Sequence, residues 1–151
     1  MKAVLQRVRG ASVVVNGGEP RTIGPGLVIL LGVSETDSPD LCSKLAQKCA
    51  GLRIFDDENG NLNLSAEDKG YEAMIVSNFT LYGDTRKGKR PSFIRAAKPP
   101  LSVDCYNEFV RQMKNTGLTG IVTGEFGADM QISLVNDGPV TIVIETDDWT
   151  R

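Results

Sequence analysis

The stretch GLVILLGV, residues Gly26–Val33, decides the fold class of this 151-residue chain. A continuous apolar run of this length is typical of a β-strand that is covered on both faces. A second run of similar length, Ala73–Tyr82 (AMIVSNFTLY), is a second long strand candidate. Strands covered on both sides need further layers of structure against them, so the pattern favours a layered α/β fold.

Upstream of this run the sequence predicts antiparallel β-structure. Residues 2–9 alternate along the chain as a strand does, and Ala11–Val15 continue in the same way. Asn16-Gly17-Gly18 then supplies residues that tolerate a positive φ, which is a strong signal for a hairpin turn.

Two segments downstream have the pattern of helices. Ser38-Pro39 is typical of an N-cap followed by proline at the first helical position, and apolar residues at helical spacing follow as far as Leu52. Ser102 is predicted to cap a second helix, and Gly117 to end it.

The remaining elements are predicted to be strands. Their expected ranges are Leu52–Phe55, Gly120–Phe126, Met130–Val135 and Val140–Glu145, with Asn136–Pro139 connecting the last two. The sequence therefore predicts one strand-rich α/β domain over residues 1–151, with about two helices.

The composition restricts the chemistry that this chain can perform. It contains no histidine, which excludes Ser–His and Cys–His dyads and His-ligated metals. Cys42, Cys49 and Cys105 have no CxxC spacing, so buried thiols are favoured over disulfides or a zinc site. We expect no metal and no cofactor. Without a signal peptide or an apolar run near the ~18 residues that span a bilayer, we expect a soluble cytoplasmic protein.

Positive charge is concentrated in one segment. The net charge is −2, yet residues 86–98 contain six basic residues and no acidic one. The segment includes Arg86, Lys87, Lys89, Arg90 and Phe93. Basic side chains beside an aromatic ring suit phosphate contacts and base stacking, although a solvated charged loop is the alternative.

Polar residues interrupt the second long strand candidate. On a strand, Asn78 and Thr80 would point to one side, and Ser77 and Phe79 to the other. Polar side chains among apolar ones need hydrogen-bond partners, so this segment is either a satisfied core network or a functional site.

These segments together resemble the D-aminoacyl-tRNA deacylase family along essentially the whole chain. The family's Ser-Gln-x-Thr-Leu motif is matched at Ser77, Thr80 and Leu81, with Asn78 in place of the usual Gln. Its Asn-x-Gly-Pro-Val-Thr motif is matched in full by residues 136–141. By itself the second motif would be an ordinary hairpin turn.

The resemblance implies a fold and an assembly. The fold would be a three-layer ββα sandwich or barrel-like, mostly antiparallel sheet with two main helices, and the chain would form a homodimer. Gly138 and Pro139, joined by a cis peptide bond, would reach into the partner's active site and exclude L-amino acids with their carbonyl groups. Arg7 would brace that loop, unless it is an exposed strand residue.

The resemblance also implies an ester hydrolase that removes D-amino acids, and glycine, from tRNA while rejecting L-aminoacyl-tRNA. The catalytic segment would be Ser77, Asn78, Phe79 and Thr80, with main-chain N–H groups near Phe79 and Thr80 holding the scissile carbonyl. Thr80 would orient the substrate rather than attack it, because no base is evident to activate its hydroxyl. The 2′-OH of the terminal adenosine would help to position water, and the basic segment would contact the single-stranded acceptor end of the tRNA.

Three other functions are compatible with the same residues. The chain could be a non-catalytic RNA-binding module, which needs no ordered Gly138–Pro139 pocket. It could be a glycyl- or L-specific relative whose Gly138–Pro139 bond is trans. It could also be a purely structural dimer, which would have no small pocket near Thr80.

Overall fold

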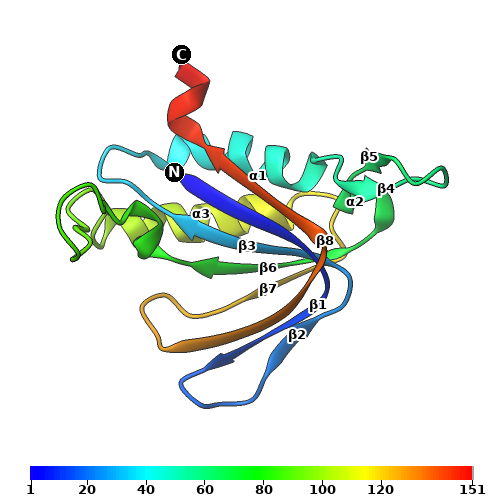
Figure 1. The fold of residues 1–151 in the computed structure, drawn as a ribbon, viewed down its shortest axis with the longest axis horizontal. Helices are drawn as coiled ribbons and strands as arrows, with labels where there is room; N and C mark the ends of the chain where they lie inside the picture. Colours follow the sequence, from blue (N-terminus) through cyan, green and yellow to red (C-terminus); the bar gives the residue numbers. More distant parts are fainter. Residues whose placement is uncertain (151) are drawn as a thin grey trace.

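A computed structural model describes residues 1–150 of the chain, which form one twisted sheet with helices packed along it (Figure 1). The sheet contains β1 (Lys2–Val15), β2 (Arg21–Ile23), β3 (Gly26–Gly32), β6 (Glu72–Ser77), β7 (Gly120–Thr123) and β8 (Met130–Glu145). The strands β4 (Phe55–Asp56) and β5 (Leu62–Leu64) pair separately. The helices are α1 (Cys42–Gly51), α2 (Ala66–Lys69) and α3 (Leu101–Lys114), with 3-10 turns η1 (Pro39–Leu41), η2 (Phe79–Tyr82) and η3 (Thr146–Thr150). None of these helices in residues 1–150 is long and apolar enough to cross a membrane.

The strand β3 lies between two hydrophobic cores. Leu27, Ile29 and Leu31 belong to the core that the sheet shares with α1 and α3. Val28, on the opposite face, belongs to a second core that lies against the far halves of β1 and β8. The prediction of a strand covered on both faces is confirmed, and the two cores separate three layers.

The third layer forms because β1 and β8 are long strands that bend together. The first half of β1 pairs with β3 and its second half with β2, while β8 runs antiparallel along the whole of it. Figure 1 shows both strands turning at one end of the molecule and folding back beneath β3 and β6. The result is the predicted barrel-like α/β fold with two main helices, and only the β3–β6 and β6–β7 pairs are parallel.

The strand β8 is continuous where two strands and a turn were predicted. Both flanks of the expected turn pair with β1, in the pairs Val8↔Asn136 and Gln6↔Thr141. Between these two pairs the chain advances by two residues on β1 and by five on β8. The additional residues of β8 have no partner on β1 and project from the ladder. The segment 137–140 is thus a bulge within one strand rather than a connection between two.

The strand β6 is shorter than predicted. It ends at Ser77, and residues Phe79–Tyr82 form the 3-10 turn η2. The partner strand β3 ends at Gly32, whose missing side chain would meet Leu81 Cβ at 3.1 Å, so the turn folds closely over the end of β3. The expectation that Asn78 and Thr80 share one face of a strand is therefore wrong.

The ends of α3 also differ from the prediction. Pro100 is the N-cap residue and Ser102 is the second residue of the helix, so Ser102 does not cap it. The helix ends at Lys114 with Asn115 as its C-cap, three residues before the expected stop at Gly117. Ser38, in contrast, caps η1 as predicted, accepting a hydrogen bond from the Asp40 N–H.

Candidate active site

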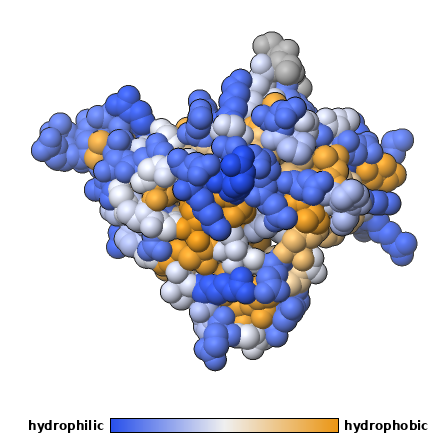
Figure 2. Space-filling model, turned by 180° about the vertical axis from the view of Figure 1, so that it is seen from behind, coloured by the Kyte–Doolittle hydropathy of each residue, from blue (hydrophilic) through white to orange (hydrophobic). Residues whose placement is uncertain are grey.

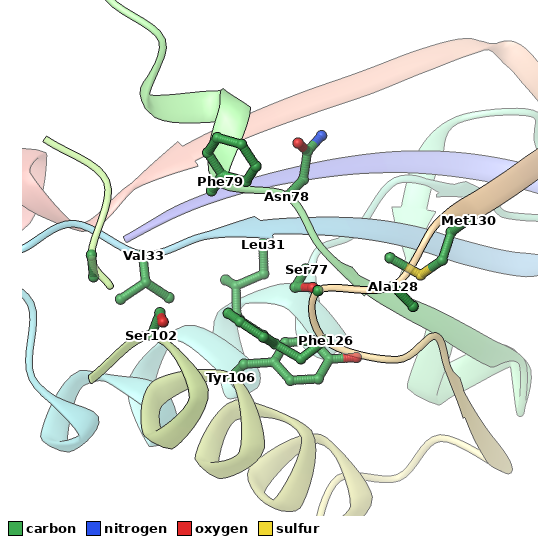
Figure 3. Close-up of a pocket in the computed structure, with 12 residues that line it drawn as sticks. Leu31, Val33, Ser77, Asn78, Phe79, Ser102, Tyr106, Phe126, Ala128 and Met130 are labelled. Carbon is green, nitrogen blue, oxygen red and sulfur yellow. The ribbon is translucent and has the colours of Figure 1, made fainter. Parts of the chain in front are cut away.

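A pocket of about 210 Å³ lies at the carboxyl ends of the parallel strands β3 and β6 (Figure 3). Its walls come from β3 and β6 with the residues that follow them, from α3, and from the β7–β8 connection; its lining residues are Leu31, Val33, Ser77, Asn78, Phe79, Ala97, Ser102, Tyr106, Phe126, Gly127, Ala128 and Met130. In open α/β sheets, ligands bind in the crevice outside the carboxyl ends of the parallel strands. The fold therefore places this pocket where a ligand is expected.

One wall of the pocket is formed by the start of η2. The first hydrogen bond of the turn runs from the Leu81 N–H to the Asn78 carbonyl oxygen, at 3.4 Å. The N–H groups of Phe79 and Thr80 come before that bond, so they have no acceptor within the turn. Two main-chain donors next to a pocket can bind a developing negative charge on a substrate oxygen.

The side chains at the start of η2 and of the residue before it point away from the α3 side of the pocket or contact one another. Thr80 is exposed, and its hydroxyl donates to Asn78 Oδ1 at 2.5 Å. Figure 3 shows the Asn78 amide and the Phe79 ring pointing away from the α3 side of the pocket. The Asn78 side chain therefore positions the Thr80 hydroxyl, and the main chain of Asn78 lines the pocket.

The opposite wall is aromatic and tightly held. Tyr106 donates its hydroxyl hydrogen to the Ile75 carbonyl oxygen at 3.0 Å, and its ring centroid lies 6.0 Å from that of Phe126. Burial raises the pKa of Tyr106 to about 12, so its hydroxyl stays protonated near neutral pH. This wall offers flat apolar surface rather than acid–base chemistry.

The cysteines do not supply a nucleophile either. All three thiols are buried and free, and burial raises the pKa of Cys42 and of Cys49 to about 12. A thiolate is the nucleophilic form, and little of it exists at these pKa values near neutral pH. The main-chain donors of η2 are thus the chemically active groups that the pocket presents most clearly.

The bulge at Gly138–Pro139 is held by Arg7. The Gly138–Pro139 peptide bond is cis. Arg7 is 7% exposed, so it is not an exposed strand residue. Its Nε donates to the Asp137 carbonyl oxygen at 2.9 Å and its Nη1 to the Ile54 carbonyl oxygen at 3.0 Å. Arg7 therefore joins the bulge to the chain just before β4.

The structure separates this bulge from the pocket. The bulge lies beside Arg7, which pairs with Leu27 of β3, whereas the pocket begins at Leu31. Four residues of strand span about 13 Å, and β1 and β3 lie between β8 and β6. Within one chain, Gly138 and Pro139 therefore do not meet Phe79 and Thr80.

The basic segment begins at the mouth of the pocket. Phe93 packs edge-on against Phe79, with ring centroids 5.2 Å apart. Arg86 forms an ion pair with Asp84 at 2.6 Å, and this guanidinium holds the pKa of Asp84 well below its usual range. In the part of the chain that the structure describes, Lys87, Lys89 and Arg90 are exposed and form no ion pair. Their charges are available to a polyanion, and that of Arg86 is largely neutralised.

Several pocket residues were not singled out from the sequence. Tyr106 lies within the second predicted helix, and Phe126 and Met130 lie within predicted strands, where apolar residues are ordinary. The sequence signal for the last two is the family resemblance, which runs along essentially the whole chain. Ser102 was expected to cap a helix and lies on the pocket wall instead.

The fold and the site define a mixed α/β protein with a pocket that has aromatic and aliphatic walls beside main-chain hydrogen-bond donors. A family model described as D-Tyr-tRNA(Tyr) deacylase matches residues 4–145. The chain belongs to this family. Among curated relatives, the D-aminoacyl-tRNA deacylase of Thermosipho africanus is 52% identical over 146 residues, which are 97% of each chain.

Two solved structures have a similar fold. One, titled "c-Myc DNA Unwinding Element Binding Protein", has a TM-score of 0.89 and 42% identity, and the match covers 97% of this chain and 99% of the other. The other, titled "Structural Analysis of a probable eukaryotic D-amino acid tRNA deacylase", has a TM-score of 0.84 and covers 95% and 97% of the two chains. At 15% identity the second likeness concerns the fold alone.

Proposed function

We propose that this protein is a D-aminoacyl-tRNA deacylase that hydrolyses the ester between a D-amino acid and the 3′ end of tRNA. The observation that carries the proposal is the pair of main-chain N–H groups at Phe79 and Thr80, which lie beside the pocket without an acceptor in their own turn. Family membership supports the same activity. Aminoacyl-tRNA is formed and used where translation takes place, so the enzyme would act in the cytoplasm.

In the proposed reaction these donors hold the ester carbonyl. Water attacks the carbonyl carbon, and the oxyanion that forms accepts hydrogen bonds from Phe79 and Thr80. The intermediate then expels the 3′-oxygen of the ribose, which receives the proton released by the water. The ribose 2′-OH next to it can relay that proton, so the enzyme needs no histidine. The products are the free D-amino acid and tRNA with an intact 3′-OH.

Thr80 acts in this scheme as an orienting residue and not as the nucleophile. Its hydroxyl hydrogen is donated to the amide oxygen of Asn78, which is too weak a base to activate it. A mechanism through the main chain also tolerates Asn78 where the family usually has Gln.

The pocket suits the terminal nucleoside better than the amino acid. Its aromatic and aliphatic walls, which include Tyr106, Phe126 and Met130, match the flat faces of a base. With the base in the pocket and the ester at Phe79 and Thr80, the amino-acid side chain points outward. The enzyme would then accept many D-amino acids, and also glycine.

Selection against L-amino acids requires a wall on the open side of the ester. Gly138 and Pro139 carry the family motif for that wall, but within one chain they lie at the other end of the sheet. A second copy of the chain can bring them to the pocket. We therefore infer a homodimer in which each subunit completes the active site of the other.

Apolar surface near the pocket supports an interface there. Phe79, Phe93 and Ile94 are 58%, 38% and 80% exposed. Figure 2 shows hydrophobic residues breaking the polar surface at the end of the molecule that carries η2 and the loop after it. The exposed Lys87, Lys89 and Arg90 beside them would contact tRNA phosphates.

The test is a comparison of D- and L-tyrosyl-tRNA as substrates. We expect the wild-type protein to release D-tyrosine and to leave the L-ester intact. Phe79→Pro should abolish turnover, because proline lacks the N–H while its ring fits the first position of a turn that follows an extended residue. Asn78 is extended, with φ −147° and ψ 90°.

A second function is favoured by one observation, the 42% identical structure whose title names a DNA-element binding protein. A nucleic-acid-binding protein without catalysis would bind uncharged tRNA or DNA and leave both tyrosyl esters intact. That result would replace the deacylase proposal.

A further inference from the structure

The pocket contains a buried polar side chain without a hydrogen-bond partner. Four residues with polar side chains line the pocket, namely Ser77, Asn78, Ser102 and Tyr106. The Tyr106 hydroxyl donates to the Ile75 carbonyl oxygen, the Asn78 amide points away from the α3 side of the pocket and accepts from Thr80, and Ser77 is half-buried. Ser102 is 4% exposed, and its hydroxyl has no partner among the residues that the structure describes.

The position of Ser102 explains why its hydroxyl is free. It is the second residue of α3, whose N-cap is Pro100, so the hydroxyl does not cap the helix. Buried Val33 and Ala97 lie on the same pocket, so its surroundings are apolar. Figure 3 shows Ser102 on the α3 wall, across the pocket from Asn78 and Phe79.

A hydroxyl in such surroundings is expected to have a partner. Nearly all buried polar side chains in folded proteins are hydrogen-bonded, and leaving one unpaired costs free energy. A ligand atom that reaches Ser102 would recover that free energy. The hydroxyl therefore indicates a polar atom on the deeply placed end of the ligand.

We propose that Ser102 determines specificity by hydrogen-bonding to the edge of the heterocyclic base of the terminal nucleoside. This inference rests on the proposed function, in which the ester lies at Phe79 on the opposite wall. The base then extends toward α3, and its edge meets the Ser102 hydroxyl. A purine edge offers ring nitrogens as acceptors and an exocyclic amine as donor, and a serine hydroxyl can both donate and accept. Apolar walls accept any flat ring, so Ser102 supplies the selection among bases.

The first test measures binding of a hydrolysis-resistant analogue, adenosine that carries a D-amino acid through a 3′-amide. By titration calorimetry we expect Ser102→Ala to bind it about three- to tenfold more weakly than wild type, the range for one lost neutral hydrogen bond. In hydrolysis assays KM should rise while kcat stays the same, because Ser102 does not touch the reacting ester.

Tyr82→Phe is the matched control. Tyr82 carries the other buried hydroxyl without a partner among the described residues, and it does not line this pocket. Its replacement should leave the affinity for the analogue unchanged. An equal loss in both variants would mean that the effect of Ser102→Ala is not specific to the pocket, and would overturn the assignment.

A second test changes the ligand and needs no variant. Analogues in which adenine is replaced by purine, 1-deazaadenine or 3-deazaadenine each lack one polar group of the base edge. At least one should bind wild type more weakly than the adenosine compound, and that difference should disappear in Ser102→Ala. Equal binding of all four compounds to wild type would overturn the inference.

The two proposals can fail separately. If wild type hydrolyses D-tyrosyl-tRNA and Ser102→Ala binds the analogue equally well, only the role of Ser102 is overturned. If wild type hydrolyses neither ester but loses analogue binding on Ser102→Ala, the deacylase proposal fails and the assignment of Ser102 to the base edge is supported.

Discussion

At the scale of single residues, the chain lacks side chains that could act as a base or nucleophile near neutral pH at the pocket, whereas its main chain can donate hydrogen bonds there. The chain has no histidine, and the pKa values of Cys42, Cys49 and Tyr106 are raised to about 12. The donors at Phe79 and Thr80 need no change of protonation to bind an oxyanion. Replacing side chains near them should therefore have smaller effects than removing an N–H.

Asn78 gives the first prediction. We expect Asn78→Ala to lower kcat/KM by less than about tenfold, because the side chain points away from the pocket and only positions the Thr80 hydroxyl through one hydrogen bond. Thr80→Ala, the matched variant, should cause a similar partial loss and leave the D-over-L preference intact. Single-turnover deacylation of D-tyrosyl-tRNA measures both, and a hundredfold loss in Asn78→Ala would show that its amide contacts the substrate.

At the scale of elements, the bulge of β8 is fixed by contacts from other strands. Arg7 of β1 donates to the main-chain oxygen of Asp137 in the bulge and to that of Ile54, just before β4. At Gly138 the φ angle is +137°, and a side chain would lie 2.9 Å from the Val140 main-chain nitrogen. The shape of this loop thus depends on a distant arginine and on a glycine that cannot be replaced without movement.

Arg7 gives the second prediction. Arg7→Ala should lower the free energy of unfolding by about 2–3 kcal/mol, because two main-chain acceptors lose a charged donor in a buried position. Arg9→Ala is the control, since Arg9 also contacts Asp137, through the side-chain carboxylate at 3.3 Å, but its own side chain is 76% exposed. Exposed ion pairs contribute about 0–1 kcal/mol. Urea unfolding measures both variants. An equal decrease in the free energy of unfolding would contradict the bracing role of Arg7.

The loop after η2 gives the third prediction. Lys87→Ala with Lys89→Ala should weaken tRNA binding and reduce the slope of log K against log salt by about 1.4, as expected for two contacts with single-stranded phosphates. Lys48→Ala with Lys114→Ala removes the same charge from exposed positions on α1 and α3 and should leave the slope unchanged. Filter binding at several salt concentrations measures both double variants. If both have the same slope as wild type, the loop is a solvated charged surface that does not contact tRNA.

At the scale of the whole molecule, the two family motifs lie at opposite ends of the sheet. The motif at Ser77–Leu81 follows β6 at the pocket, whereas Gly138–Pro139 lies where β1 and β8 bend. No local rearrangement joins them, because β1 and β3 lie between the strands that carry them. In the homodimer proposed above, each copy would give its bulge to the pocket of the other.

Subunit complementation gives the fourth prediction. Phe79→Pro removes the oxyanion donor. The side chain that Gly138→Ala adds lies too close to Val140, so it should push the bulge against the ester in the partner's site, and each variant alone should be inactive on D-tyrosyl-tRNA. After subunit exchange of an equal mixture, about a quarter of the wild-type activity should return, because half of the dimers are mixed and each has one site with both parts intact. Native mass spectrometry would establish the exchange. Mixed dimers without activity would mean that one chain supplies the whole site.

The sequence predicted the layers of the fold and the family of the protein, because these can be read from local stretches of sequence. The apolar run Gly26–Val33 requires cover on both faces, and the cores on either side of β3 are that cover. The motifs at residues 77–81 and 136–141 identified the family before any contact was known. The first inference needs only the preference of apolar side chains for the interior, and the second needs only the resemblance of two short segments to the motifs of a family.

The tertiary structure alone decided where strands end and which groups meet. β6 stops at Ser77 because its neighbour β3 stops at Gly32, and β8 stays one strand because β1 pairs with it on both sides of the bulge. Ser102 could have capped a helix, but the helix starts at Leu101, two residues earlier than such a cap requires, and Ser102 lies on the pocket wall. Strand ends, bends and pocket walls depend on the length and register of elements far apart in sequence, and no local pattern contains that information.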